Sequence, residues 1–208
     1  MRYKESKQLR MSLYDLFLEQ ALDCELNYEL TISFTNQSMI GNKNPFRLTQ
    51  KDLPDGERLI KAYLGYMDRH VNHGMQHDAI AIPEFKTSSG EDSILHYHCL
   101  ISVDKSNFMR FWRFTSKFMS EKGNKHFGSP FDYHLAEIAN IEAYITYSLK
   151  TIDGDYPIDR IILWGEMDEG RVQPEHLPAG ATWSAAKVTN FNLLISSPSA
   201  NTQIESAT

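Results

Sequence analysis

The sequence has little of several features that mark particular classes of protein. Only Cys24 and Cys99 occur as cysteines among 208 residues, and they lack metal-type spacing. The first eight residues contain no apolar signal core, and no stretch approaches the roughly 20 apolar residues of a membrane span. We therefore expect thiols rather than a disulfide, no membrane partner and a cytoplasmic location.

Positive charge is also scarce. The chain carries 21 Lys and Arg residues against 27 Asp and Glu, for a formal net charge of -6. This balance argues against a protein that coats nucleic acid through bulk positive charge. A small local contact stays open, because residues 104–126 hold only Asp104 and Glu121 as acids. The bases of that segment are Lys105, Arg110, Arg113, Lys117, Lys122 and Lys125.

Length and composition suit one well-packed domain. Of the 208 residues, 41% are hydrophobic and 12% aromatic, enough for a single core but not for two large domains. We expect one domain over residues 1–170, with its core at about 28–165 behind an N-terminal helix. Residues 171–208 are expected to form a partly disordered extension, because the apolar pattern fades there into small and polar residues.

Hydrophobic periodicity predicts an α+β fold. The expected strands are 28–35, 79–85, 94–103, 131–135 and 159–164, and the expected helices are 12–25, 55–71, 107–121 and 138–151. Ser12–Asp15 resembles a capping box at the start of the first helix, and loops are expected at 42–45 and 123–130. This order fits an antiparallel sheet of split βαβ type, ferredoxin- or RRM-like, with helices packed on it.

Two groups of side chains in these helices are interpreted as structural. The aromatic stripe over 108–119, including Trp112, is expected in the core, because a base-stacking platform needs exposed rings. His70, His73 and His77 lie at or beyond the end of a helix, where histidines interact well with the helix dipole. We favour that interpretation over a metal cluster.

The stretch Ile94–Val103 carries the most chemical information. As a strand it puts His96 and His98 on one face, because side chains alternate with a period of two. Two neutral imidazoles on a rigid strand make half of a site for a divalent metal. The same pattern also occurs as the half-exposed polar face of an ordinary strand, so a third ligand has to be found.

That ligand is expected from the preceding strand. Ala79–Phe85 is a short apolar run, and the polar residues 87–92 join it to the histidine strand as a hairpin. In such a pair Glu84 can lie beside the histidines, which gives a set suited to Mg²⁺ or Mn²⁺ with positions left for substrate and water. Glu91 and Asp92 compete for this role, but they lie in the expected turn, so Glu84 is preferred.

The helix after residue 138 supplies candidate nucleophiles. Tyr144, Tyr147 and Lys150 follow one another at three-residue steps and are neighbours on a helix surface. A lysine beside a phenol favours the phenolate, and it can offset charge on a phosphate under attack. Tyrosines at this spacing also form the ordinary amphipathic seam of a helix, so the motif gains meaning in combination with others.

Together, Glu84, the pair His96 and His98, and Tyr147-Ser148-Leu149-Lys150 resemble the HUH endonuclease superfamily. Their order is similar to that of rolling-circle replication initiators, filamentous-phage-like ones most nearly, over roughly residues 28–164. Tyr147 is the expected nucleophile because Lys150 completes its motif, and Tyr144 is the reserve.

Two departures limit what the resemblance implies. Two-tyrosine members usually place their tyrosines four residues apart, whereas these are three apart, so a mechanism that alternates between both is not expected. The chain has no Gly-X-X-X-X-Gly-Lys-Ser/Thr phosphate loop, so no fused helicase is expected.

The resemblance implies metal-dependent nicking and rejoining of single-stranded DNA at an origin or hairpin. Mn²⁺ or Mg²⁺ at the metal site would polarise the phosphate, and Tyr147 would attack phosphorus to leave a 5′-phosphotyrosine. This reaction would initiate replication of a phage, plasmid or mobile element, with a host replication helicase as a further partner. The strand would cross the histidine face, with Arg110, Arg113 or Lys117 as backbone contacts.

Other functions stay open on the residues alone. A cupin-like metalloenzyme also uses His-X-His plus Glu, but it needs a Glu a few residues after the pair, and residues 100–106 contain none. A 2H phosphoesterase would need two His-X-Thr/Ser motifs, which His96-Tyr97-His98 is not. A non-catalytic single-strand nucleic-acid binder would use Tyr97 and neighbouring aromatics, and it would form no covalent adduct.

Overall fold

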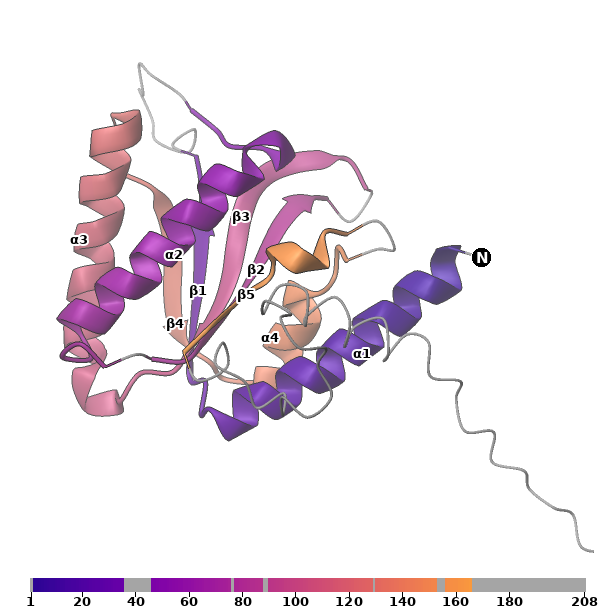
Figure 1. Cartoon of the computed structure of the whole chain (residues 1–208), viewed down its shortest axis with the longest axis horizontal. Coiled ribbons are helices and arrows are strands. Elements are labelled where there is room, and N and C mark those ends of the chain that lie inside the picture. Colours follow the sequence, from indigo (N-terminus) through magenta and orange to yellow (C-terminus); the bar gives the residue numbers. More distant parts are fainter. Residues whose placement is uncertain are drawn as a thin grey trace, which may run out of the picture.

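One antiparallel sheet organises the described part of the chain, and helices lie on both of its faces (Figure 1). The computed structural model describes residues 2–35, 46–75, 77–87, 90–128, 130–152 and 156–165. The main elements are α1 (Arg2–Asp23), β1 (Tyr28–Ser33), α2 (Leu53–His70), β2 (Ala79–Lys86), β3 (Asp92–Ile101), α3 (Phe108–Phe127), β4 (Asp132–Glu137), α4 (Ile141–Ser148) and β5 (Ile162–Trp164). The predicted α+β fold is confirmed.

The strand order β4-β1-β3-β2-β5 explains which helices share a face. β1 and β2 both pair antiparallel with β3, so they run parallel to each other and β1-α2-β2 is a split βαβ unit. By the same logic β3 and β4, which both pair with β1, make β3-α3-β4 a second unit. Because such crossovers are almost always right-handed, α2 and α3 lie on one face. The other face is left to α4 and to α1, which packs on α4.

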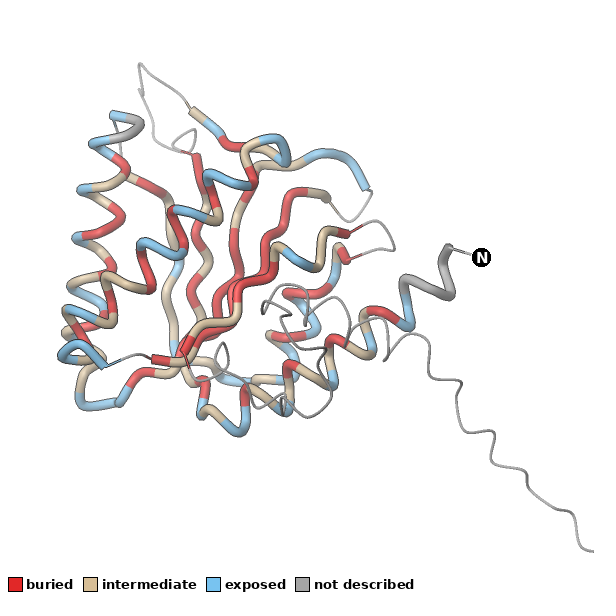
Figure 2. The backbone as a smooth tube through the Cα atoms, in the orientation of Figure 1, coloured by how far each residue is buried: buried red, intermediate tan, exposed pale blue. Residues whose placement is uncertain are grey.

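The face toward α2 and α3 holds an apolar core. Figure 2 shows buried positions along the central strands and on the helices that cover them. Alternate side chains of β1 and β3 point to it, and all are buried: Tyr28, Leu30, Ile32, Leu95, Tyr97 and Cys99. α2 adds the apolar stripe that its periodicity predicts, and the hydroxyl groups of Tyr63 and Thr115 join α2 to α3 across 2.9 Å. Each fully buried large apolar side chain contributes about 1.5–3 kcal/mol, so this face stabilises the fold.

The structure corrects the predicted end of α3. The helix continues to Phe127 and ends where Gly128 adopts a left-handed conformation with φ 73, so residues 123–127 are helix and not loop. Gly123 does not break it, because a glycine inside a helix costs only about 1 kcal/mol relative to alanine. Trp112 is also a correction: it is 47% exposed, whereas its neighbour Phe111 is buried in the core as expected.

The predicted start of α1 is wrong by ten residues. The helix begins at Arg2, and Ser12 lies in its interior and not at its cap. Leu9, Leu13 and Phe17 are buried at four-residue steps, so the apolar stripe continues on the N-terminal side of Ser12. The Arg10 guanidinium donates a hydrogen bond to the Ile152 carbonyl at 3.1 Å, which ties α1 to the chain just beyond α4.

Two further elements are shorter than predicted. α4 begins only at Ile141, because the Asn140 side chain caps it by accepting a hydrogen bond from the Ala143 amide at 2.9 Å. Residues 158–160 form a 3-10 turn, which leaves Ile162–Trp164 as strand β5. The loop predicted at 42–45 and the extension 171–208 lie outside the described residues. In the described part, no helix combines the length and the apolar character that crossing a membrane requires.

Candidate functional site

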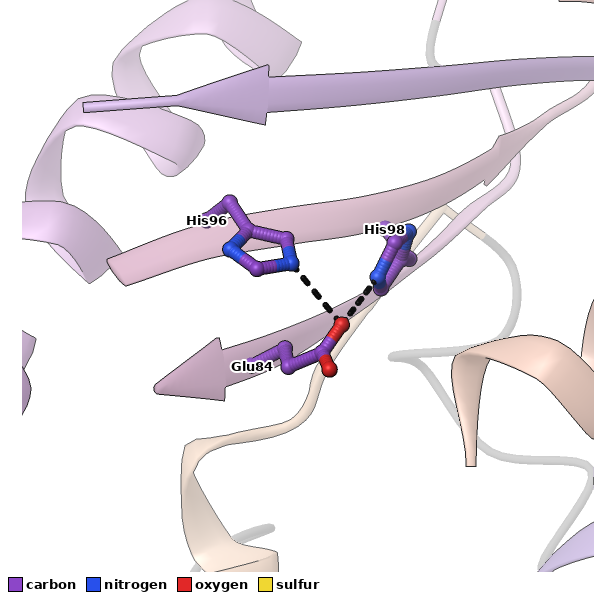
Figure 3. Close-up of side chains that lie close together, drawn as sticks. All are labelled: Glu84, His96 and His98. Atoms are coloured by element: carbon purple, nitrogen blue, oxygen red, sulfur yellow. Dashed lines mark hydrogen bonds and ion pairs between the residues drawn. The ribbon is translucent and has the colours of Figure 1, made fainter. Parts of the chain in front are cut away.

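The hairpin of β2 and β3 brings the three predicted metal ligands together. Glu84 on β2 lies directly opposite His96 on β3, and His98 lies opposite Ile82 two residues away. Leu95, Tyr97 and Cys99, which alternate with the two histidines along β3, are buried in the apolar core. Because side chains alternate along a strand, both imidazoles point to the opposite face of the sheet. Figure 3 shows the two rings converging on the Glu84 carboxylate.

The contacts within this group are short. One oxygen of Glu84, Oε2, lies 2.8 Å from His96 Nε2 and 2.6 Å from His98 Nε2. The three ligand atoms all lie within 4.8 Å of one another. Glu84 and His98 are buried, and the His96 side chain is 20% exposed, so the group opens to solvent beside His96. The competing carboxylates Glu91 and Asp92 are exposed and outside the group.

The other nitrogen of each imidazole is also held. His96 Nδ1 lies 3.0 Å from the Ile94 carbonyl, and His98 Nδ1 lies 3.2 Å from the Thr31 hydroxyl. A carbonyl only accepts hydrogen bonds, so His96 Nδ1 has to carry a proton. Nε2 can then either carry a second proton and donate it to Glu84 Oε2, or turn its lone pair toward that oxygen, where two acceptors would face each other. A cation between these two atoms removes the conflict, and the residues therefore fit a divalent metal.

Electrostatics favour the ligand forms of Glu84 and His98. Burial alone would raise the pKa of Glu84, but hydrogen bonds from His96 and His98 outweigh it and hold that pKa well below the ordinary value. Burial is the largest influence on His98 and lowers the pKa of its imidazole, with the Glu84 carboxylate acting in the opposite direction. An ionised carboxylate and a neutral imidazole are the forms that bind a metal.

α4 places Tyr147 over this group. The helix buries Ile145 and Ser148, whereas Tyr147 is 50% exposed. Its ring meets the His98 ring edge-on, with centroids 5.1 Å apart and planes at 78°. The expected nucleophile and the expected metal ligands are therefore close in space, although they come from separate parts of the chain.

Lys150 lies between the phenol and the carboxylate. Its Nζ is 3.2 Å from Glu84 Oε2 and 3.6 Å from the centroid of the Tyr147 ring. Partial burial works against the charged form, but the Tyr147 hydroxyl and the Glu84 carboxylate prevail and raise the pKa of Lys150. The ammonium group therefore stays protonated at neutral pH.

Tyr144 is placed differently from Tyr147. Its ring is also edge-on to His98, at 6.2 Å between centroids, but its hydroxyl is buried. Burial raises the pKa of this phenol above its ordinary value. A buried phenol that resists ionisation is a poor nucleophile, so the geometry favours Tyr147.

The predicted DNA contacts do not join the site. Arg110, Arg113 and Lys117 all belong to α3, which packs on the opposite face of the sheet, where Phe108 stacks on Tyr28. Arg110 lies 3.2 Å from His73 Nε2, and Lys117 lies 3.7 Å from Glu121. The expectation that they contact a strand on the histidine face is therefore wrong, because the sheet separates them from it.

Tyr97 cannot serve as an exposed stacking platform. It is 0% exposed and meets Phe34 edge-on in the core beneath α2 and α3.

The histidines near the end of α2 were interpreted as structural, and His77 supports this, because its Nδ1 lies 2.5 Å from Asp68. Asp68 also accepts a hydrogen bond from the Trp164 indole at 3.0 Å, which ties α2 to β5.

Sequence reasoning missed Thr31 and the Ile94 carbonyl. Both contact an imidazole nitrogen that faces away from the metal group. Thr31 pairs directly with His98 across β1 and β3, so only the strand register would have revealed it.

Comparisons with known proteins leave the geometry as the basis for a function. No family model matches the chain, and no curated protein or solved structure matches it either.

Proposed function

We propose that the chain is a metal-dependent endonuclease of the HUH type, which nicks and rejoins single-stranded DNA through a phosphotyrosine at Tyr147. One observation carries this proposal: the ligand atoms of Glu84, His96 and His98 gather within 4.8 Å of one another, and an exposed phenol from a separate helix lies against His98. An ordinary polar strand face needs neither the convergence of three ligand atoms nor the phenol beside them.

The three ligands would hold Mn²⁺ or Mg²⁺ and leave other coordination positions to substrate and water. When bound, such an ion supplies positive charge that polarises the scissile phosphate. The contribution of the chain is rigidity: β2 and β3 fix the ligand atoms, and Thr31 and the Ile94 carbonyl fix the orientation of the imidazoles.

Tyr147 would attack the phosphorus of the bound strand. Its phenol oxygen forms the new bond to phosphorus, the bond from phosphorus to the 3′-oxygen breaks, and the phenolic proton passes to that leaving oxygen. The products are a 5′-phosphotyrosine and a free 3′-hydroxyl. The phosphotyrosine is itself a phosphodiester, so a later 3′-hydroxyl can reverse the step and rejoin DNA without ATP. Lys150, beside the ring, would stabilise negative charge on the phenol oxygen and the phosphate.

The single-stranded substrate follows from the resemblance, and the surface beside the site supports it. The sheet surface next to His98 carries the half-buried Thr31 and Ser33 and the exposed His134, which are polar side chains that a DNA strand could contact. By the same resemblance, the proposed role is origin nicking at the start of rolling-circle replication. Origin or hairpin DNA and a host replication helicase would be the partners.

The two main rivals lose support. Cupins are double-sheet jelly rolls, whereas the described strands form one sheet with helices on it. The non-catalytic binder was expected to use Tyr97 and neighbouring aromatics, and of these Tyr97 is buried.

Formation of a covalent adduct tests the function. The protein is incubated with origin-derived single-stranded DNA and Mn²⁺, and an SDS-stable protein–DNA band is sought. We expect Tyr147→Phe to abolish the band, because the nucleophilic oxygen is lost while the ring remains. Tyr144→Phe is the matched control, and we expect it to keep the band. An adduct that survives in Tyr147→Phe, or that Tyr144→Phe removes, would overturn the assignment.

A further inference from the structure

Lys150 contacts both halves of the proposed site. Its ammonium is 3.2 Å from Oε2 of Glu84, a proposed metal ligand, and 3.6 Å from the ring centroid of Tyr147, the proposed nucleophile. The backbone fixes where this side chain starts, because the Lys150 amide donates to the Tyr147 carbonyl at 3.2 Å in the turn that follows α4. Among the described residues, no other lysine or arginine forms an ion pair with Glu84.

Glu84 Oε2 is crowded. The same oxygen lies 2.8 Å from His96 Nε2, 2.6 Å from His98 Nε2 and 3.2 Å from Lys150 Nζ. An ion bound by this oxygen and both imidazoles would lie close to the ammonium, because Lys150 Nζ contacts the same oxygen. Two like charges that close to one carboxylate repel each other in a poorly hydrated site.

Of Glu84 and Lys150, only the lysine side chain is free to move away. The Glu84 side chain is 4% exposed and held on a central strand, whereas the Lys150 side chain is 32% exposed and ends a flexible four-carbon stem. The ammonium can therefore leave the carboxylate while staying near Tyr147, because its contact with the ring does not depend on Glu84.

We propose that Lys150 and the divalent cation compete for Glu84 Oε2, so that cation binding transfers the lysine from the carboxylate to Tyr147 and the incoming phosphate. This inference rests on the proposed metal site. The exchange would set an order of events. The cation binds first, and Lys150 then becomes available to the nucleophile and the DNA.

The first test measures Mn²⁺ affinity without DNA, by calorimetric titration of the full chain. Lys150→Met keeps the apolar stem and removes the charge, and we expect it to bind Mn²⁺ at least about tenfold more tightly than the unchanged protein. Lys105→Met is the matched control, because Lys105 is an exposed lysine paired with Glu137 at 3.2 Å, far from the hairpin site, and its removal should leave the affinity unchanged.

A second readout separates exchange from a general effect of charge. In the unchanged protein, acylation of lysines by a water-soluble N-hydroxysuccinimide ester is followed residue by residue with mass spectrometry. We expect saturating Mn²⁺ to raise the acylation rate of Lys150 several-fold and to leave that of Lys105 unchanged.

The outcomes distinguish this inference from the function beneath it. If Mn²⁺ binds but Lys150→Met binds it no more tightly, or Lys150 acylation does not respond to Mn²⁺, the exchange is overturned while the metal site stands. If neither the unchanged protein nor Lys150→Met binds Mn²⁺, both the exchange and the metal site are overturned. Binding by Lys150→Met alone would support competition in its strongest form. Failure to nick DNA would overturn the proposed function and leave the exchange result intact.

Discussion

The two faces of the sheet differ in the side chains that the same strands present, apolar on one face and ionisable on the other. Toward α2 and α3, β3 presents Leu95, Tyr97 and Cys99, all completely buried among apolar neighbours. Toward α4, one residue out of step, it presents His96 and His98 to a buried carboxylate. Burying such polar groups costs free energy unless they are paired, so the first face stabilises the fold by apolar burial, whereas the second depends on the contacts of both imidazoles with Glu84.

This difference teaches that the strand register serves both faces at once. A slip of one residue in β3 would move the histidines into the core and the tyrosine into the site. The apolar face therefore does more than stabilise the fold. Burial of Leu95 and Tyr97 on that face also fixes the side of the sheet to which the imidazoles point. Mutations on the two faces should separate stability from chemistry, and the following predictions test that separation.

His98→Ala should have the largest effect, and on chemistry. It removes a buried side chain of the proposed metal site, so we expect Mn²⁺ affinity to fall by more than the roughly 100-fold that an outer partner of a metal ligand can cost. Covalent adduct formation should disappear with it. Calorimetry and the adduct assay measure the two effects, and near-normal Mn²⁺ binding in His98→Ala would contradict the site.

Ile60→Ala probes the opposite face. Ile60 on α2 is completely buried in the core, so its truncation should lower the free energy of unfolding by about 2–5 kcal/mol. The loss would be read from urea denaturation. Under conditions where the variant stays folded, its Mn²⁺ affinity should match that of the unchanged protein; a large loss of affinity would mean that the faces are not separable in this way.

Thr31→Val sharpens the comparison on the histidine face. The change keeps the shape of the side chain and removes the hydroxyl that meets His98 Nδ1 at 3.2 Å. We expect Mn²⁺ affinity to fall by about 10-fold, the lower end of the range for outer partners. Thr146→Val is the control, since the Thr146 hydroxyl bonds only the Glu142 carbonyl within the exposed side of α4. Equal effects of the two changes would refute the role of Thr31.

The smallest expected effect is a pH dependence of stability. Burial lowers the pKa of His98 in the folded chain, whereas unfolding returns it to about 6.5. Below pH 6.5 the unfolded chain therefore binds the extra proton first, and the free energy of unfolding should decrease as the pH falls toward the folded-state pKa. Urea denaturation with a chelator at pH 7.5, 6.5 and 5.5 measures this, and His98→Asn should flatten the dependence. If the free energy of unfolding instead rises on acidification, and His98→Asn removes that rise, the prediction is contradicted.

The sequence predicted the hairpin and the meeting of Glu84, His96 and His98, because their signals are local. A period of two places His96 and His98 on one face, and the polar turn before them sets Glu84 against His96, as the register confirms. The contact between Tyr147 and His98 joins residues that are far apart in the sequence, so a local pattern does not predict it. The spacing of Tyr144, Tyr147 and Lys150 could suggest which phenol to favour, but not which hydroxyl is buried. That distinction depends on how α4 packs.

The errors arose where the outcome depends on distant parts of the chain. Arg110, Arg113 and Lys117 were expected near the histidines, but the handedness of the β3-α3-β4 crossover puts α3 on the other face. Ser12 resembled a cap, yet packing against α4 continues α1 past it. Local propensity is a weak guide at such boundaries, because tertiary contacts override it.

The most direct test identifies the residue that carries DNA. The adduct formed with single-stranded DNA and Mn²⁺ is digested, and the peptide that holds the nucleotide is sequenced by mass spectrometry. We predict a phosphodiester on Tyr147 that forms only with a divalent metal and is lost in Glu84→Gln. A nucleotide on Tyr144 or another residue, or an adduct that forms equally well in a chelator, would contradict the account.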